Sequence, residues 1–523
     1  MTRLARSHLV LTCLAVLVLT TMAQPGHGQL GTINFPNSGA PAAQAEFVRG
    51  VLLLHSFEYD DAAKAFQQAQ RLDSAFALAY WGEAMTYTHP VWNRQDLPAA
   101  RAALAGLAST AEARQSKART LREKAYLAAA EVLYGEGSKP RRDTLYSAAM
   151  ERLTRAYPAD DEARAFYALS LLGLNQGDRE LWSYMHAAAL SQEILDKSAN
   201  HPGAAHYLIH AFDDPAHAPL GLRAARAYSK IAPDAAHAQH MTSHIFVAMG
   251  LWDDVVSANE LAMKVTERQR GRSPLGCGHY NEWLEYGYLQ QGRTHEAERL
   301  VNECWADIEG RGGPHGAIER MRSIYLIDSR DWNGPVARRT TDTTRELPWA
   351  RTLRDFTDGL RAVEIGDLAT ARLMLDRVSR RPLLAANKEV MVRTLRAAVA
   401  FADRQSQQAL AELERAATLE DSLPFEFGPP AALKPPREFK GEYLLALERP
   451  AEAAREFEQA LRRTPRRVAT LLGLARASAR AGDTERALAV YAELKGIWHR
   501  AEPGISELAE ADQYLAHRTS ARR

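Results

Sequence analysis

Histidine is concentrated in one part of this 523-residue chain. Residues 201–244 contain seven of its 17 histidines, in the stretches HPGAAHYLIHAFDDPAHA and HAQHMTSH. Histidine titrates near neutral pH and is the most common metal ligand, so such a cluster can bind a metal, transfer protons or line a polar binding surface. HYLIH and HMTSH each carry two histidines four residues apart, the spacing with which one helix chelates a metal ion.

A second group of polar and aromatic residues lies nearer the N-terminus, in LLHSFEYDD and AYWGEAMTYTHPVW. Aromatic side chains with a few convergent polar groups are typical of a ligand pocket. The candidates in this second patch are His55, Trp81, Glu83, His89 and Trp92. The alternative, which the sequence favours, is that Tyr87 and Trp92 form core between structural units and that His89 caps a helix before Pro90.

Sequence motifs of other chemistries are missing from the chain. It has no GxSxG turn, no GxxxxGK[ST] phosphate loop, no HExxH zinc motif and no CxxC pair. The sequence therefore assigns no catalytic residue and favours a protein that is not an enzyme.

The charge composition argues against nucleic acid as the main partner. The chain has 65 Lys and Arg against 64 Asp and Glu, a net charge of +1, with no long run of either sign. A nucleic-acid-binding protein usually carries a basic patch or a strong positive excess. Its 46% hydrophobic and 25% charged residues are typical of a folded globular protein.

The N-terminus, MTRLARSHLVLTCLAVLVLTTMAQPGHGQ, has the layout of a secretory signal. Two arginines precede an apolar run from Leu9 to about Met22, and small residues follow. The run is short for a membrane span, which needs about 20 apolar residues, so an uncleaved signal anchor is the one membrane attachment to expect. We predict a signal peptide over 1–28, a flexible segment over 29–42, and a protein that is exported to the periplasm or secreted.

Small and large residues recur with fixed spacing in helical segments along the chain. PPREFKGEYLLALERPAEAAREFEQALRRTP and VATLLGLARASARAGDTERALAVYAELKGIW show the pattern most clearly. The marker residues of these two units are Gly441, Ala453, Phe457, Ala460 and Pro465, then Gly482, Ala487, Tyr491 and Leu494. Upstream, the same spacing joins Gly50, Ala62, Phe66 and Ala69, and also Gly250, Val255, Asn259 and Ala262. The pattern resembles the tetratricopeptide repeat, a helix-turn-helix unit of 34 residues.

This resemblance implies an all-α fold, a superhelical solenoid of roughly nine to eleven antiparallel helix pairs. It assigns TPR-like repeats with insertions to 43–422, a loop rich in proline and aromatic residues to 423–436, two well-matched units to 437–500, and a capping helix and tail to 501–523. We expect the loop to be ordered, because a long structureless insertion in a compact array is usually functional. Arrays of this family usually bind a peptide or partner protein in a concave groove lined by the first helix of each pair, here called the A helix.

In this repeat register, three A helices begin near Ala205, Ala236 and Gly278, and their polar side chains face the groove. The predicted groove wall consists of His206, His210, Asp213, His237, His240, His244, His279, Glu282 and Tyr286. Five of its histidines, His206, His210, His237, His240 and His244, could hold a divalent transition metal, with Asp213 as a further ligand or a partner of the ligands. The alternative, which the sequence favours, is a solvated polar wall that binds a peptide without metal.

The two cysteines beyond the signal, Cys277 and Cys304, are expected to form a disulfide. Two cysteines in an oxidising compartment suggest one bond. The repeat register places Cys277 at the start of one helix and Cys304 late in its antiparallel partner, which brings them together; two separate buried thiols are the alternative.

Two functions therefore remain open. The first is an exported scaffold that binds a peptide or partner protein, and the second is a metalloprotein or metal-dependent enzyme that uses the histidine patch.

Overall fold

The computed structural model describes residues 28–174, 179–270, 277–311, 316–340, 347–382, 386–425 and 427–520. These residues form 26 α-helices, two short 3-10 helices and one pair of two-residue strands. The predicted all-α class is therefore correct. Of the predicted signal peptide, residues 1–27 lie outside the described residues.

The elements follow one another along the chain with short connections. In order they are α1 (Pro41–His55), α2 (Tyr59–Leu72), α3 (Ala77–Met85), β1 (Thr88–His89), η1 (Pro90–Trp92), β2 (Arg94–Gln95), α4 (Leu97–Leu107), α5 (Ala111–Lys117), α6 (Leu121–Leu133), α7 (Lys139–Ala156), α8 (Asp161–Gly173), α9 (Leu181–Lys197), α10 (Pro202–Phe212), α11 (Ala218–Ile231), α12 (Ala236–Met249), α13 (Trp252–Arg270), α14 (His279–Gln290), α15 (Thr294–Arg311), α16 (Gly316–Ser329), α17 (Pro335–Arg338), α18 (Pro348–Glu364), α19 (Leu368–Arg380), α20 (Ala386–Ala402), α21 (Ser406–Ser422), α22 (Pro436–Ala446), α23 (Pro450–Arg463), α24 (Val468–Arg480), α25 (Thr484–Ile497), η2 (Trp498–Arg500) and α26 (Ser506–Ser520).

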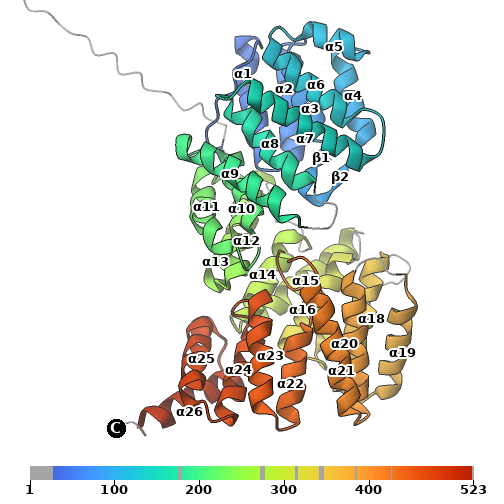
Figure 1. The fold of residues 1–523 in the computed structure, drawn as a ribbon, viewed down its shortest axis with the longest axis vertical. Helices are drawn as coiled ribbons and strands as arrows, with labels where there is room; N and C mark the ends of the chain where they lie inside the picture. Colours follow the sequence, from blue (N-terminus) through green and yellow to red (C-terminus); the bar gives the residue numbers. More distant parts are fainter. Residues whose placement is uncertain are drawn as a thin grey trace, which may run out of the picture.

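Consecutive helices pack as hairpins, and each hairpin packs against the next (Figure 1). The packing depends on the small residues of the repeat pattern. A Cβ added at Gly50 or Gly82 would come within 2.7 Å or 2.3 Å of the Phe66 ring, so only glycine lets this ring fill the space between α1, α2 and α3. Phe457 occupies the equivalent space against Gly441 and Gly473 at the other end of the chain. The first and the last repeats are therefore packed by the same contact, an aromatic ring against two glycines.

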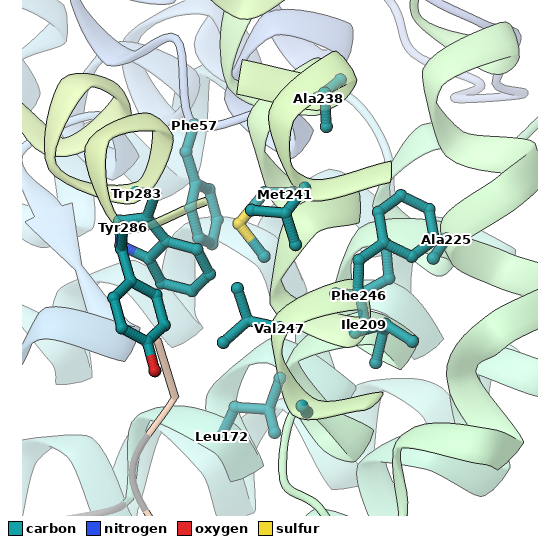
Figure 2. Packing of buried hydrophobic residues seen from close by; sticks show 14 of the residues in the cluster. Phe57, Leu172, Ile209, Ala225, Ala238, Met241, Phe246, Val247, Trp283 and Tyr286 are labelled. Carbon is teal, nitrogen blue, oxygen red and sulfur yellow. The ribbon is translucent and has the colours of Figure 1, made fainter. Parts of the chain in front are cut away.

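The hydrophobic core is continuous through most of the chain, and its central part surrounds α12 (Figure 2). Met241 and Phe246 of this helix belong to the same buried cluster as Ile209 of α10 and Trp283 of α14. Because α12 is buried on nearly all sides, its polar residues are also removed from solvent. The site described below depends on this burial.

The segment predicted to be flexible, 29–42, is packed instead. Residues 28–40 run without helical structure along the helices, and α1 begins at Pro41. Leu30 and Phe35 are buried, and the Phe35 ring lies 5.4 Å from that of Phe47 and 5.7 Å from that of Trp81. The prediction was wrong because these two apolar side chains complete the core of the first repeats.

The C-terminal repeats fold back onto the middle of the chain. The Arg466 guanidinium donates to the carbonyl of Gly250 at 3.0 Å, and the Val468 amide donates to the Gln290 side chain at 3.0 Å. Arg467, fully buried, pairs with Asp328 of α16 and with Glu438 of α22. The array therefore closes on itself, so that α24 lies against the ends of α12 and α14.

In the described part of the chain, no helix has the length and apolar character that crossing a membrane requires. The predicted loop over 423–436 is ordered at its described residues, with α22 beginning at Pro436. The capping helix predicted within 501–523 is α26.

Candidate metal centre

Three neighbouring helices carry the histidines of the cluster. His206 and His210 lie one turn apart on α10, His237, His240 and His244 lie on α12, and His279 is the first residue of α14. Spacings of three and four residues put the side chains of each helix on one face. The predicted starts of α12 and α14 are correct to within one residue, whereas α10 begins at Pro202 rather than near Ala205.

These histidines form two adjacent groups of three. In each group, one possible ligand atom from every member lies within 4.8 Å of those of the other two. The first triad is His206, His210 and His237, and the second triad is His240, His244 and His279. The triads are neighbours, because the ring centroids of His210 and His244 are 5.4 Å apart and those of His237 and His240 are 5.9 Å apart.

The expected solvated groove wall is wrong for this part of the chain. Five of the six histidines are buried, with at most 6% of the surface exposed, and only His279 is exposed. Phe57, in the turn between α1 and α2, lies 4.2 Å from the His206 ring, and Phe427 of the 423–436 loop stacks on His244 at 5.0 Å. Segments far away in the sequence therefore cover the histidines.

Asp213 fixes the protonation of one histidine in each triad. Its Oδ2 atom accepts hydrogen bonds from Nδ1 of His210 at 3.3 Å and from Nδ1 of His244 at 3.1 Å. Arg179 donates to the other oxygen, Oδ1, at 2.6 Å. Burial opposes ionisation, but Arg179 and the two imidazoles hold the pKa of Asp213 well below its ordinary value. Because an ionised carboxylate only accepts, both Nδ1 atoms carry a proton, and in a neutral imidazole the lone pair then lies on Nε2.

Two further histidines are fixed in the same tautomer by other partners. Nδ1 of His206 donates to the backbone carbonyl of His55 at 2.7 Å. Nδ1 of His240 lies 2.6 Å from Oδ1 of Asn259, whose amide nitrogen donates to the Val255 carbonyl and so orients its oxygen toward the imidazole. Both Nε2 atoms are therefore unprotonated as well.

Within the described part of the chain, the Nε2 atoms of the buried histidines have no hydrogen-bond partner. This holds for His206, His210, His237, His240 and His244. An unpaired buried acceptor costs about 1–3 kcal/mol, so five of them in one place need a cause. A metal-bound histidine has this arrangement: Nδ1–H is held by a carboxylate or carbonyl, and Nε2 presents its lone pair to the ion.

Burial favours the neutral form of four of these imidazoles. Burial, followed by the neighbouring histidines, lowers the pKa of His206, His237 and His240 well below the ordinary value. Burial lowers the pKa of His244 to about 4, although Asp213 opposes the shift. Neutral imidazoles are the form that binds metals.

A third histidine group nearby serves a different purpose. His55 and His201 both hydrogen-bond to Glu162 through Nε2, at 2.7 Å and 3.1 Å. Their Nδ1 atoms are also occupied, by the Tyr207 hydroxyl and by the Ala204 amide. Burial opposes ionisation of Glu162, but His201 and His55 lower its pKa to about 2. Since all four ring nitrogens are satisfied, this group holds α1, α8 and α10 together and offers no free lone pair.

A pocket of about 730 Å³ opens beside the triads and touches one histidine of each, His237 and His279. Its walls are rich in aromatic and charged residues from distant elements. They include Tyr59, His89, Trp92, Tyr280 and Trp283, together with Glu58, Asp61, Arg94, Arg270, Glu282 and Arg320. The Tyr59 and His89 rings stack at 3.8 Å.

The other predicted site residues separate into two sets. His89, Trp92 and Glu282 line the pocket. The preferred interpretation of His89 and Trp92 also agrees with the structure, because Nε2 of His89 bonds to the Thr86 carbonyl at the end of α3 and Trp92 packs, partly buried, against the core. Trp81 and Glu83 do not line it: Trp81 packs on Tyr126 and Phe166, and the amides of Gln67 and Gln70 bind Glu83. In the same way, Tyr286 lies away from the pocket, with its hydroxyl bonded to Arg467, because the Tyr286 side chain leaves α14 on the face toward α24.

The predicted disulfide is present. Cys277 and Cys304 are bonded, with Cα atoms 4.3 Å apart. The bond ties the residue before the N-cap of α14 to α15, and His279 follows Cys277 by two positions.

Sequence reasoning did not identify Arg179, Asn259, Phe57 or Tyr280 as parts of the site. The sequence did indicate that Asn259 is unusual, because it occupies the repeat position at which Phe66 and Phe457 stand in other units. A polar residue in a slot for a large apolar side chain indicates a buried polar partner. The other three are recognisable only from contacts between distant segments.

Helix hairpins in series, with glycines against an aromatic ring, define a helical repeat protein. The Tetratricopeptide repeat family matches residues 444–496, within α22 to α25. The chain is therefore a TPR-containing helical repeat protein, a class whose extended surfaces commonly bind other proteins.

Several solved structures show a weak overall similarity. The human IFIT1 dimer with m7Gppp-AAAA is 11% identical, with 88% of this chain and 90% of that chain covered and a TM-score of 0.36. Yeast Tom70 is 14% identical, with 92% and 95% covered and a TM-score of 0.29. Cut9 in the APC/C complex with Hcn1 is 10% identical, with 93% and 78% covered and a TM-score of 0.33. No curated protein sequence matches the chain significantly. These values are too low to support an inference about function.

Proposed function

We propose that this chain is a metalloprotein in which a tetratricopeptide array positions two adjacent three-histidine metal sites. The observation that carries the proposal is a set of five buried histidines, grouped in two triads, whose Nε2 atoms have no partner among the described residues. In four of the histidines a partner at Nδ1 directs the lone pair to Nε2. A peptide on a polar wall explains neither their burial nor this common tautomer.

The donor set selects the class of metal. Imidazole nitrogen suits Zn, Cu, Fe and Ni, whereas Mg, Ca and Mn prefer carboxylate, carbonyl and water oxygens. Asp213, the carboxylate nearest the ligands, is already held by Arg179, His210 and His244. The ion is therefore a late first-row transition metal bound by neutral nitrogen donors.

Partner binding remains the second candidate function, and the pocket favours it. An opening of about 730 Å³ is of the size that holds a small molecule or a peptide side chain. Because it touches His237 and His279, a ligand there would also reach both metal sites. The two functions are compatible, with the pocket as the entrance to the triads.

Elemental analysis of the untagged protein, purified without chelator, tests the metal proposal. We expect stoichiometric metal in the wild type, and a lower content in His206→Ala and His240→Ala, each of which removes one ligand from one triad. His499→Ala is the matched control, because His499 is exposed on η2 and far along the chain. A wild type without metal, also after incubation with Zn(II) and Cu(II), would contradict the proposal.

The proposal includes export from the cytoplasm. The N-terminal arginines and apolar run support it, and so does the disulfide, which forms and persists in oxidising compartments. N-terminal sequencing of the protein from its native compartment is the test, with cleavage between Ala23 and about residue 28 as the expected result.

A further inference from the structure

The charges around the two triads limit which ions can occupy both of them. The six ligands are imidazoles and bring no negative charge. Asp213, Asp214 and Arg179 together contribute one net negative charge beside the triads. The pocket adds no net negative charge, because the three carboxyl groups among its described wall residues, Glu58, Asp61 and Glu282, are matched in number by Arg94, Arg270 and Arg320.

Glu285, a further buried carboxyl on α14, does not change this balance. Burial raises its pKa well above the ordinary value, which favours the uncharged form. Two divalent ions would therefore place four positive charges against one negative charge in a buried site, which is costly. Two monovalent ions lower the net charge of the site from +3 to +1.

The number of donors also distinguishes between ions. A structural zinc site is closed by four protein ligands, whereas each triad supplies three nitrogens. Three-coordinate nitrogen sites suit Cu(I), and copper is also the first-row divalent metal that nitrogen sites bind most tightly. The two described cysteines are joined in a disulfide, so the site differs from the thiolate sites that store copper.

The triads are placed so that two ions can act together. His210 and His244 share the Asp213 carboxylate, which holds one ligand of each triad in a common position. Trp283 stacks on His244 at 4.4 Å and lies 5.0 Å from His240, and Phe57 covers His206. The ligands thus lie in an apolar surrounding, while the pocket leads to one histidine of each triad.

From these observations, and resting on the proposed metal function, we infer that the triads hold a pair of copper ions that binds and reduces dioxygen. In the reduced state each triad holds one Cu(I). Each ion gives one electron to O2, the O–O double bond becomes a single bond, and the product is peroxide bound to two Cu(II) ions. The step needs no other reductant and no proton. Release of the peroxide takes two protons from water as hydrogen peroxide, and return to Cu(I) needs an external electron donor such as ascorbate.

Anaerobic loading of the full-length protein with Cu(I), followed by addition of O2, tests the inference. We expect about two copper ions per chain and uptake of about one O2 for every two coppers. Acid should release a matching amount of hydrogen peroxide. Coupled Cu(II) ions give little electron paramagnetic resonance signal, so the signal after oxidation should be far below the total copper.

Single substitutions test whether O2 uptake needs a copper ion in both triads. His206→Ala and His244→Ala each disable one triad, so each should retain about one copper and take up O2 at least roughly ten-fold more slowly. His499→Ala should behave as the wild type. Circular dichroism of each variant establishes that it is folded, and the copper retained in the intact triad is a second check.

The outcomes distinguish this inference from the proposed function. If the triads bind zinc or another ion with His206- and His244-dependent stoichiometry but the Cu(I) protein takes up no O2, the dioxygen inference is wrong and the metal function stands. Isolated Cu(II) with a full resonance signal would also overturn it. Failure to bind any metal overturns both.

Discussion

Asp213 offers the sharpest test of the candidate metal centre, because one carboxylate oxygen holds a histidine of each triad. Asp213→Asn keeps the size of the side chain but replaces one acceptor oxygen with an amide that donates. If the amide nitrogen faces the imidazoles, Nδ1 must accept and the proton moves to Nε2. If the oxygen faces them, the hydrogen bonds become weaker and neutral, and Arg179 loses its charged partner. In either orientation both triads are impaired by a single substitution.

The size of the effect follows from the contacts. Loss of a partner that orients a metal-bound histidine typically costs 10–100-fold in affinity, so we expect a decrease of roughly that size at each triad. Removing one member of a buried ion pair costs about 3–5 kcal/mol. Since Arg179 also contacts Asp214 at 3.1 Å, we expect the lower end, about 3 kcal/mol, in the free energy of unfolding of the metal-free protein.

Metal affinity would be measured by competition with a chromophoric chelator, and stability by urea unfolding without metal. Asp214→Asn is the matched control: Asp214 binds Arg179 and His217 but no histidine of either triad. It should lose a similar amount of stability and keep its metal affinity. Equal affinity in Asp213→Asn and the wild type would refute the tautomer argument, because the shared carboxylate would then have no influence on the ligands.

Three further changes test other parts of the structure. The pKa of Glu162 in the folded protein is about 2, below its ordinary value. Its contribution to stability is therefore present above about pH 4.5 and is lost as the pH falls toward 2. Between about pH 6 and pH 3, the urea midpoint of unfolding should fall more in the wild type than in Glu162→Gln. Replacing Cys277 and Cys304 with alanine should lower the free energy of unfolding by roughly 3 kcal/mol, since the bond closes a 27-residue separation, and an unchanged urea midpoint would contradict this. Arg467→Met leaves the buried Asp328 without its cation, whereas Glu438 keeps Lys434, so limited proteolysis should release the C-terminal repeats faster and stability should fall by about 3–5 kcal/mol. A wild-type cleavage rate would show that the closure contributes little.

The spacing of small and large residues along the sequence was sufficient to predict much of the fold. Glycine and aromatic positions such as Gly441 and Phe457 follow directly from the steric needs of packed hairpins, so helix pairs could be placed from spacing alone. The same register placed the histidines of α12 and α14 on a common face, and the disulfide followed from the order of antiparallel helices. These features depend on neighbours in the sequence or in the next hairpin.

The remaining features depend on contacts that spacing does not encode. Burial of the triads requires Phe57 to cover His206 of α10 and Phe427 to cover His244 of α12, although the two phenylalanines lie far apart in the chain. For the same reason, the sequence could not show that Glu162 and Tyr207 occupy both ring nitrogens of His55. His55 was therefore assigned to a binding patch. Whether a histidine is a ligand or a structural residue depends on what occupies its second nitrogen, which only the folded chain determines.

The ion pairs of Arg467 with Asp328 and Glu438 set the number of repeats that this chain can tolerate. In an open array, gain or loss of a unit changes only the length of the surface. Here a 34-residue unit inserted between α16 and α24 would shift Arg467 away from Asp328 and separate Val468 from Gln290 at the end of α14. The array is therefore closed, and the number of units within the closed part is fixed. Helices α12 and α14 belong to this part and carry four of the six triad histidines. Changes in repeat number would therefore disturb the spacing of the triad histidines.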